Sequence, residues 1–135
     1  MGSSHSRCAG IVGAKGDDLE ALADLAREHD LVVLSDEIYS RFLYEGEHHS
    51  ITAFPGMTDQ TIILDGFSKT YAMTGWRVGY CTASEAITRA MFLVLQQSSR
   101  GPATFVQDAA VEALTGPQDC VVEMRNQYAE RRTAV

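Results

Sequence analysis

The sequence predicts an α/β fold in which a short mixed sheet is flanked by helices, in three αβα layers. Two short and largely apolar runs, Leu31-Val32-Val33-Leu34 and Thr61-Ile62-Ile63-Leu64, lack the alternation of a half-exposed strand. Such runs are typical of strands that are covered on both faces, as in a parallel sheet. Segments with apolar residues at helical spacing lie before and after these runs. This order of elements favours an α/β domain.

The first helix is expected from Asp17 to His29, with Asp17 as its N-cap and Glu20 at the capping-box position. Its apolar stripe consists of Leu19, Leu22, Ala23 and Ala26. Residues 1–16 are rich in Gly and Ser and show no clear period, so we expect an irregular segment there.

Strands are expected near residues 31–35, 61–65 and 76–81. The first two should be adjacent and parallel. The third follows the second too closely for a crossover helix to fit between them, so it should run antiparallel beside the second. We expect Glu45–Ser50 to form a polar loop and Pro55-Gly56 to form a turn.

Three further helices should follow, at about 84–98, at about 103–115 and from Pro117 to the end. Gly116 is expected as the C′ residue of one helix, and Pro117 as the N1 residue of the next. The residues expected to face inward in the first two of these helices are Ile87, Met91, Val94, Leu95, Phe105, Ala109, Ala113 and Leu114. The last helix carries Val121, Met124 and Tyr128 at helical spacing.

The composition fits one compact domain. The chain has 135 residues, of which 45% are hydrophobic and 21% charged, and a formal net charge of -7. This charge argues against nucleic acid or an anionic membrane as a partner. We expect a cytoplasmic protein, because no apolar run has the length of a bilayer span and no export signal is visible. The three cysteines and the His48-His49 pair have no metal-ligand spacing, so no metal site is expected.

Polar side chains lie at or near the ends of the expected strands. Asp36 ends the first strand, and Tyr39 follows it by three residues. Ser68 and Lys69 follow the second strand, and Arg77 lies at the start of the third. Ligands of open α/β sheets bind at the carboxyl ends of the strands. An amine, a carboxylate that we expect to be buried, a phenol and two phosphate ligands are the groups needed to hold and use pyridoxal phosphate.

Each of these residues fits one part of that cofactor. Lys69 can form the Schiff base and carry a proton. Asp36 can pair with the ring nitrogen, and Tyr39 can hydrogen-bond the phenolic oxygen. Ser68 and Arg77 can together grip the phosphate, although a glycine-rich phosphate loop is lacking. Taken alone, each also has an ordinary explanation: a solvated lysine, a turn or N-cap aspartate, a packing tyrosine, or a paired surface arginine.

Two segments, Ser35-Asp36-Glu37-Ile38-Tyr39 and Gly66-Phe67-Ser68-Lys69-Thr70-Tyr71-Ala72-Met73-Thr74-Gly75-Trp76-Arg77-Val78-Gly79-Tyr80, closely resemble class I/II aminotransferases of fold type I. The resemblance is strongest to the aspartate/aromatic aminotransferase branch of bacteria and archaea. It runs from about Asp17 to the C-terminus. It implies that Lys69 is the Schiff-base lysine and Asp36 the pyridinium partner. It likewise implies that Tyr39 binds the phenolic oxygen and that Ser68 and Arg77 bind the phosphate.

The resemblance also implies amino-group exchange between an amino acid and a 2-oxo acid, and a homodimer for the full-length protein. Residues 17–135 would be part of the large, cofactor-binding domain, ending in the helix that leads to a small domain. Family members carry an Asn-Pro-x-Asn-Pro-Thr-Gly segment where this chain has Ser4-His5-Ser6-Arg7-Cys8-Ala9-Gly10. The arginine that binds the substrate carboxylate would lie beyond Val135. We therefore expect a central fragment with little transaminase activity of its own.

Two alternatives remain open from the sequence. Another pyridoxal-phosphate enzyme, such as a carbon–sulfur lyase, would share the lysine motif. A non-catalytic fragment that binds the cofactor or a partner chain, or only fills a structural place, would share the fold.

Overall fold

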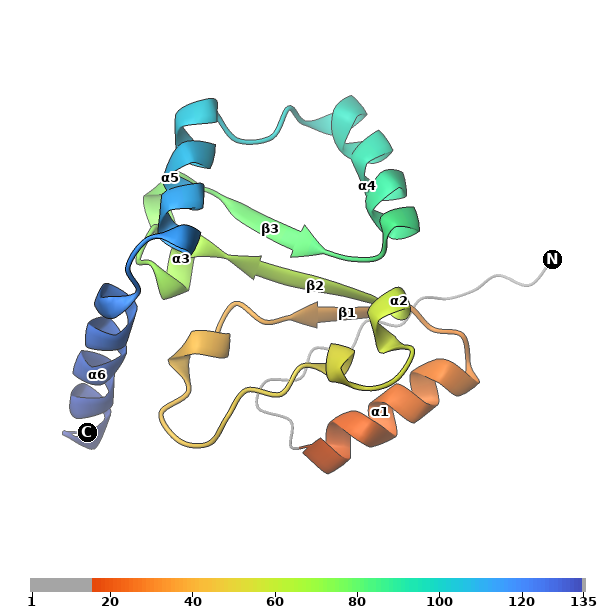
Figure 1. Cartoon of the computed structure of the whole chain (residues 1–135), viewed down its shortest axis with the longest axis horizontal. Coiled ribbons are helices and arrows are strands. Elements are labelled where there is room, and N and C mark those ends of the chain that lie inside the picture. The colour runs from red at the N-terminus through yellow and green to blue at the C-terminus, as the bar shows by residue number, and fades with distance from the viewer. Residues whose placement is uncertain (1–15, 135) are drawn as a thin grey trace. The chain divides into compact units, whose positions relative to one another are not determined.

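A computed structural model describes residues 16–134 (Figure 1). The helices are α1 (Gly16–Glu28), α2 (Met57–Gln60), α3 (Phe67–Thr70), α4 (Glu85–Ser98), α5 (Thr104–Thr115) and α6 (Asp119–Thr133). The strands are β1 (Val33–Asp36), β2 (Thr61–Gly66) and β3 (Gly79–Thr82). Short 3₁₀ turns are η1 (Ser40–Phe42), η2 (Ile51–Ala53) and η3 (Thr74–Trp76). The irregular segment predicted for residues 1–16 lies outside the described residues, except Gly16, which begins α1.

The three strands form one mixed sheet in the order β1-β2-β3. β1 and β2 are parallel, with Val33 opposite Thr61 and Asp36 opposite Leu64. β3 runs in the opposite direction to β2 (Figure 1). The predicted α/β class, strand order and strand directions are therefore confirmed, as are the flanking helices.

The described chain divides into two compact units, and each takes three separate stretches of sequence. The first unit contains the described residues up to Glu37, then His49–Leu64 and Cys81–Ser98. The second unit contains Ile38–His48, Asp65–Tyr80 and the described residues from Ser99 onward. The assignment of residues 17–135 to one partial large domain stays a prediction.

The core of the first unit forms where α1 packs against η2 and α2. Ala23 and Ala26 of α1, Ile51 of η2 and Met57 of α2 are each 4% exposed or less. The residues packed against them are Leu19, Leu22, Val33 and Phe54. The predicted inward stripe of α1 is therefore confirmed. The helix begins at Gly16 rather than after Asp17, so Asp17 lies in the first turn and is not the N-cap.

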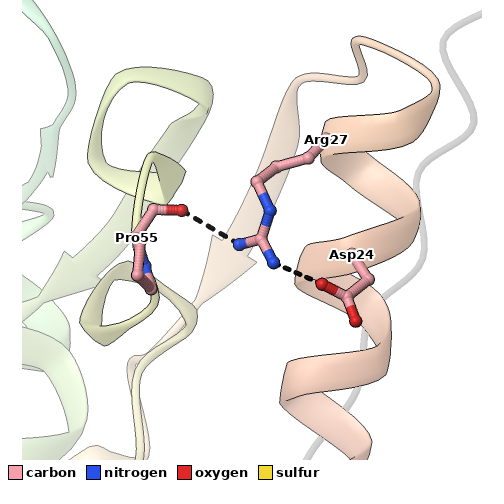
Figure 2. A network of polar contacts seen from close by, with 3 residues as sticks. All are labelled: Asp24, Arg27 and Pro55. Atoms are coloured by element: carbon pink, nitrogen blue, oxygen red, sulfur yellow. Dashed lines mark hydrogen bonds and ion pairs between the residues drawn. The ribbon is translucent and has the colours of Figure 1, made fainter.

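Arg27 ties α1 to the turn that precedes α2 (Figure 2). Its Nη1 donates a hydrogen bond of 2.9 Å to the carbonyl oxygen of Pro55, and its Nη2 pairs with the Asp24 carboxylate. Gly56 has a φ of 80°, a left-handed conformation that glycine adopts without steric cost. The turn predicted at Pro55-Gly56 is thus confirmed.

β3 is shorter than the strand predicted at 76–81. Trp76 belongs to η3, and Arg77 has a φ of 51°. A left-handed residue cannot continue a pleated strand, so pairing begins only at Gly79. Ala72 has the same kind of backbone, with a φ of 53°. The segment between β2 and β3 is therefore a folded loop rather than a simple lead into the strand.

Several residues predicted to face inward are exposed. Val94 and Leu95 of α4 are 67% and 44% exposed, and Phe105 and Leu114 of α5 are 69% and 50% exposed. In α5 the buried residues are instead Val106 and Ala110. We expected β1 to be covered on both faces, but its residues alternate between partly buried and exposed, so one face is exposed.

The junction of α5 and α6 lies where it was predicted, but its residues have other roles. Gly116 has an extended φ of −75°, not the left-handed conformation of a C′ glycine. Gln118, not Pro117, directly precedes α6 as its N-cap. Among residues 16–134, no helix is both long enough and apolar enough to cross a membrane.

Candidate functional site

Lys69 lies in the loop between β2 and β3, which belongs to the second unit. We call residues 67–78 the lysine loop. The side chain is exposed, and its Nζ lies 5.8 Å from the centroid of the Tyr39 ring. Such a position over an aromatic face is favourable for an amine that carries a proton. Within the described part of the chain, no carboxylate pairs with Lys69. It is therefore not a surface lysine held by an acid.

Tyr39 is held by an aromatic cluster of the second unit. Its ring meets that of Phe42 edge-on, with a centroid distance of 6.4 Å and an interplanar angle of 78°. Phe42 in turn lies 5.6 Å from the ring of Tyr128 on α6. Because Tyr39 itself is 50% exposed, its phenol remains accessible to a ligand. The structure thus brings together Lys69 and Tyr39, two predicted site residues that are 30 positions apart.

The two predicted phosphate ligands lie at the two ends of the lysine loop. Ser68 is half-buried and precedes Lys69 in the single turn of α3. Arg77 is exposed, and its Nη1 donates a hydrogen bond of 3.2 Å to the carbonyl oxygen of Thr74. This bond holds the guanidinium against its own loop and occupies only one of its donors.

Asp36 is the last residue of β1, so it lies at a carboxyl end of the sheet, as predicted. The prediction that its carboxylate is buried was wrong, since Asp36 is exposed. The cause is the alternation of β1: Val33 and Ser35 are partly covered, whereas Leu34 and Asp36 are exposed. Asp36 belongs to the first unit, and the other four predicted residues belong to the second.

The sequence reasoning missed a polar pair at the base of the lysine loop. The Tyr80 hydroxyl donates a hydrogen bond of 3.0 Å to Oδ2 of Asp65. The other carboxylate oxygen, Oδ1, accepts a bond of 2.6 Å from the backbone N–H of Gly66. Partial burial, followed by the negative charge of Asp65 and this hydrogen bond, raises the pKa of Tyr80 to about 12. The predicted antiparallel pairing sets the end of β2 beside the start of β3, but which residues meet there depends on where β3 begins, and no sequence signal gave that position.

A second connection leads from the lysine loop to the junction of α5 and α6. The Tyr71 hydroxyl donates a hydrogen bond of 3.1 Å to Oε1 of Gln118. Gln118 then donates through Nε2 to the carbonyl oxygens of Ala113 and Gly116, at 2.9 and 2.8 Å. The amide of Gln118 therefore joins the residue two places after Lys69 to the start of α6.

A surface depression in the described part of the chain contains none of the predicted site residues. This open depression of about 430 Å³ is lined by Tyr44, Glu45, Ala129, Arg132 and Thr133. Between residues 16 and 134, no group of three or more His, Cys, Asp or Glu side chains is placed to hold a metal ion.

The sequence has the signature of a known family. Residues 12–135 match the family described as aminotransferase class I and II. The chain belongs to this family. The predicted resemblance, including its aspartate/aromatic branch, is therefore confirmed, and members of this family use pyridoxal phosphate.

Two curated members of the family illustrate the similarity. An aromatic-amino-acid aminotransferase of Thermococcus litoralis is 46% identical over 121 residues, which cover 87% of this chain and 31% of that protein. An aspartate aminotransferase of Pyrococcus abyssi is 45% identical over 124 residues, with coverage of 90% and 32%. The chain thus spans about a third of the length of the family members that it matches.

Solved structures of the family agree with the fold. The aromatic aminotransferase of Pyrococcus horikoshii superimposes with a TM-score of 0.85 at 43% identity, covering 90% of this chain and 33% of that one. The aspartate aminotransferase of Thermus thermophilus with maleate gives a TM-score of 0.79 at 42% identity, with coverage of 87% and 31%. The partial α/β architecture is therefore that of one segment of the family fold.

Proposed function

We propose that this chain supplies the lysine-bearing part of a pyridoxal-phosphate site in an aminotransferase. The observation that carries the proposal is the position of Lys69, whose Nζ lies 5.8 Å from the Tyr39 ring centroid and has no carboxylate partner among residues 16–134. The whole protein would exchange an amino group between an amino acid and a 2-oxo acid. Similar proteins are named as aminotransferases of aromatic amino acids and of aspartate, which supports an aromatic amino acid or aspartate as the amino donor.

The donor set fits this cofactor chemically. One unit supplies the amine of Lys69, the phenol of Tyr39, the hydroxyl of Ser68 and the guanidinium of Arg77. An aldehyde, a phenolic oxygen and a phosphate are the groups that these side chains recognise. The carboxylate of Asp36, the last residue of β1, suits a protonated ring nitrogen. When bound, the cofactor supplies an electron sink for the substrate's α carbon.

Each side chain of the proposed site has one task. Lys69 would hold the cofactor's aldehyde group through its Nζ, and as a free amine it would carry the proton that moves to or from the substrate's α carbon. Tyr39 would donate a hydrogen bond from its hydroxyl to the cofactor's phenolic oxygen. Ser68 would bind the phosphate through its hydroxyl, and Arg77 would bind it through its charged guanidinium.

The remaining assignments follow from the same proposal. Residues 17–135 form part of the large, cofactor-binding domain, and α6 leads towards a small domain. The full-length protein is a homodimer. Because this chain spans about a third of its relatives, we expect it to show little or no turnover with aspartate or an aromatic amino acid as amino donor. Steady turnover at ordinary enzyme rates would contradict this.

The chain allows a direct test, because Lys69 and Lys15 are its only lysines. The 135-residue chain is incubated with pyridoxal phosphate, reduced with borohydride, digested and examined by peptide mass spectrometry. We expect the pyridoxyl group on Lys69, and little on Lys15, which serves as the internal control. Lys69→Arg should abolish the labelling, whereas Lys15→Arg should leave it unchanged. Equal labelling of both lysines would refute the proposed site.

A further inference from the structure

We infer that Asp65 and Tyr80 are positioning residues for Lys69: their hydrogen bond closes the base of the lysine loop and fixes the turn that carries the amine. The inference rests on the proposed function only in giving Lys69 a cofactor to meet. Asp65 and Tyr80 belong to the second unit, as does the whole loop.

The turn that carries Lys69 is too short to hold itself. α3 has four residues, and a helix of one turn has no stability of its own in water. Its N-cap is Gly66, which has no side chain to cap it. The orientation of Lys69 therefore depends on contacts made on either side of the turn.

Asp65 makes two of these contacts with one carboxylate. Oδ1 accepts from the N–H of Gly66, directly before α3, and Oδ2 accepts from the hydroxyl of Tyr80 on β3. The carboxylate of Asp65 thus connects Gly66, the last residue of β2, to Tyr80 on β3. Hydrogen bonds to a charged acceptor are about twice as strong as those between neutral groups.

The ring of Tyr80 adds an apolar contact to the same turn. It lies 5.6 Å from the ring of Phe67, which begins α3 and is buried to 2% exposure. Phe67 also lies 5.6 Å from the ring of Tyr71, which follows α3. The ring of Tyr80 therefore contacts Phe67 at the start of α3, and its hydroxyl is held by the carboxylate of Asp65. The raised pKa of Tyr80 keeps this hydroxyl a donor at any ordinary pH.

The central experiment compares Tyr80→Phe with the unchanged chain in the borohydride assay. Phe keeps the ring contact with Phe67 and removes only the hydroxyl that reaches Asp65, so the fold should be retained. We expect labelling of Lys69 relative to Lys15 to fall several-fold, while the far-ultraviolet circular dichroism stays unchanged. An unchanged ratio of Lys69 to Lys15 labelling would overturn the inference.

A conservative variant separates positioning from general stability. In Asp65→Asn, the amide oxygen can still accept from Gly66, and the amide nitrogen can donate to the Tyr80 oxygen. We expect Asp65→Asn to restore most of the labelling that Asp65→Ala loses. Equal losses in Asp65→Asn and Asp65→Ala would refute the hydrogen-bonded pair as the positioning element.

A readout without the cofactor distinguishes failure of the inference from failure of the proposed function. Trp76 is the only tryptophan and lies in the lysine loop. In the absence of pyridoxal phosphate, Tyr80→Phe should increase the quenching of Trp76 fluorescence by acrylamide, and Asp65→Asn should not. If the unchanged chain fails to label at Lys69 but this pattern holds, the loop is positioned as inferred and the cofactor proposal is wrong. Identical quenching in all variants would overturn the inference itself.

Discussion

The backbones of Gly66 and Gly79 approach each other so closely that a Cβ on Gly66 would lie 3.3 Å from the Cα of Gly79. A Cβ on Gly79 would lie 3.1 Å from the carbonyl oxygen of Asp65. Neither neighbour is a flexible side chain that could turn away. The backbone segments that enter and leave the lysine loop therefore lie so close together that a side chain on either glycine would require a backbone shift.

Alanine at either glycine should destabilise the chain. We expect Gly79→Ala to lower the free energy of unfolding by about 1–3 kcal/mol, because backbone atoms must move apart to admit the methyl group. Gly66→Ala should cost less, since its closest contact is slightly longer. Gly75→Ala is the matched control within the same loop, because nothing lies within 4 Å of its added Cβ. Urea unfolding measures all three, and an equal cost for Gly75→Ala would argue against the close approach of Gly66 and Gly79.

The Tyr80 phenol should titrate well above the ordinary tyrosine range. Its pKa is raised from 10.0 to about 12 in the folded chain, so the neutral phenol is favoured by folding. The stability that this group contributes is fully present below pH 10 and is lost as the pH rises from 10 to about 12. Tyrosinate absorbance should show one late phenol that is missing in Tyr80→Phe. Titration of that phenol near pH 10 would contradict the Asp65 contact.

Thr61→Val should stabilise the chain. Thr61 begins β2, is 1% exposed, and its Oγ1 has no hydrogen-bond partner among the described residues. A buried hydroxyl without a partner costs roughly 1–3 kcal/mol, and valine has nearly the same shape. We expect an increase of about 1 kcal/mol in the free energy of unfolding by urea titration. Thr61→Ser, which keeps the hydroxyl and removes the methyl group, should be destabilising. A loss of stability in Thr61→Val would show that the hydroxyl is satisfied.

Gln118→Ala should be more damaging than Tyr71→Phe. The Tyr71 variant removes one hydrogen bond, whereas the Gln118 variant removes that bond and two more, to the carbonyl oxygens of Ala113 and Gly116. At about 1 kcal/mol for each net bond, we expect losses of about 1 and about 2–3 kcal/mol. The double variant should lose no more than Gln118→Ala alone, because the Tyr71 bond is shared. Additive losses would show that Tyr71 and Gln118 act separately.

The sequence predicts the fold well where local patterns determine it. Strand order, strand directions and the α1 stripe follow from apolar runs and connection lengths, which are local properties of the chain. The inward face of α4 could not be predicted in this way. Phe92, Leu93, Val94 and Leu95 are consecutive, so apolar side chains surround the helix and no single stripe stands out.

The candidate site shows the same division. The meeting of Tyr39 and Lys69 could be expected, because both residues belong to motifs whose roles are linked. The Asp65–Tyr80 bond could not, because it depends on where pairing of β3 begins. That point is set by the left-handed residue Arg77, and arginine is not a residue type that favours a positive φ, so the sequence gives no sign of it.

The interleaving of the two units restricts how such a chain can be recombined. Between residues 37 and 99 the polypeptide passes from one unit to the other at 37/38, 48/49, 64/65, 80/81 and 98/99. A genetic crossover at any single point between residues 38 and 98 therefore inherits pieces of both units from each parent. Swapping the lysine loop between two aminotransferases would leave Lys69 in a foreign aromatic cluster, unless the segment with Tyr39 and Phe42 were exchanged with it.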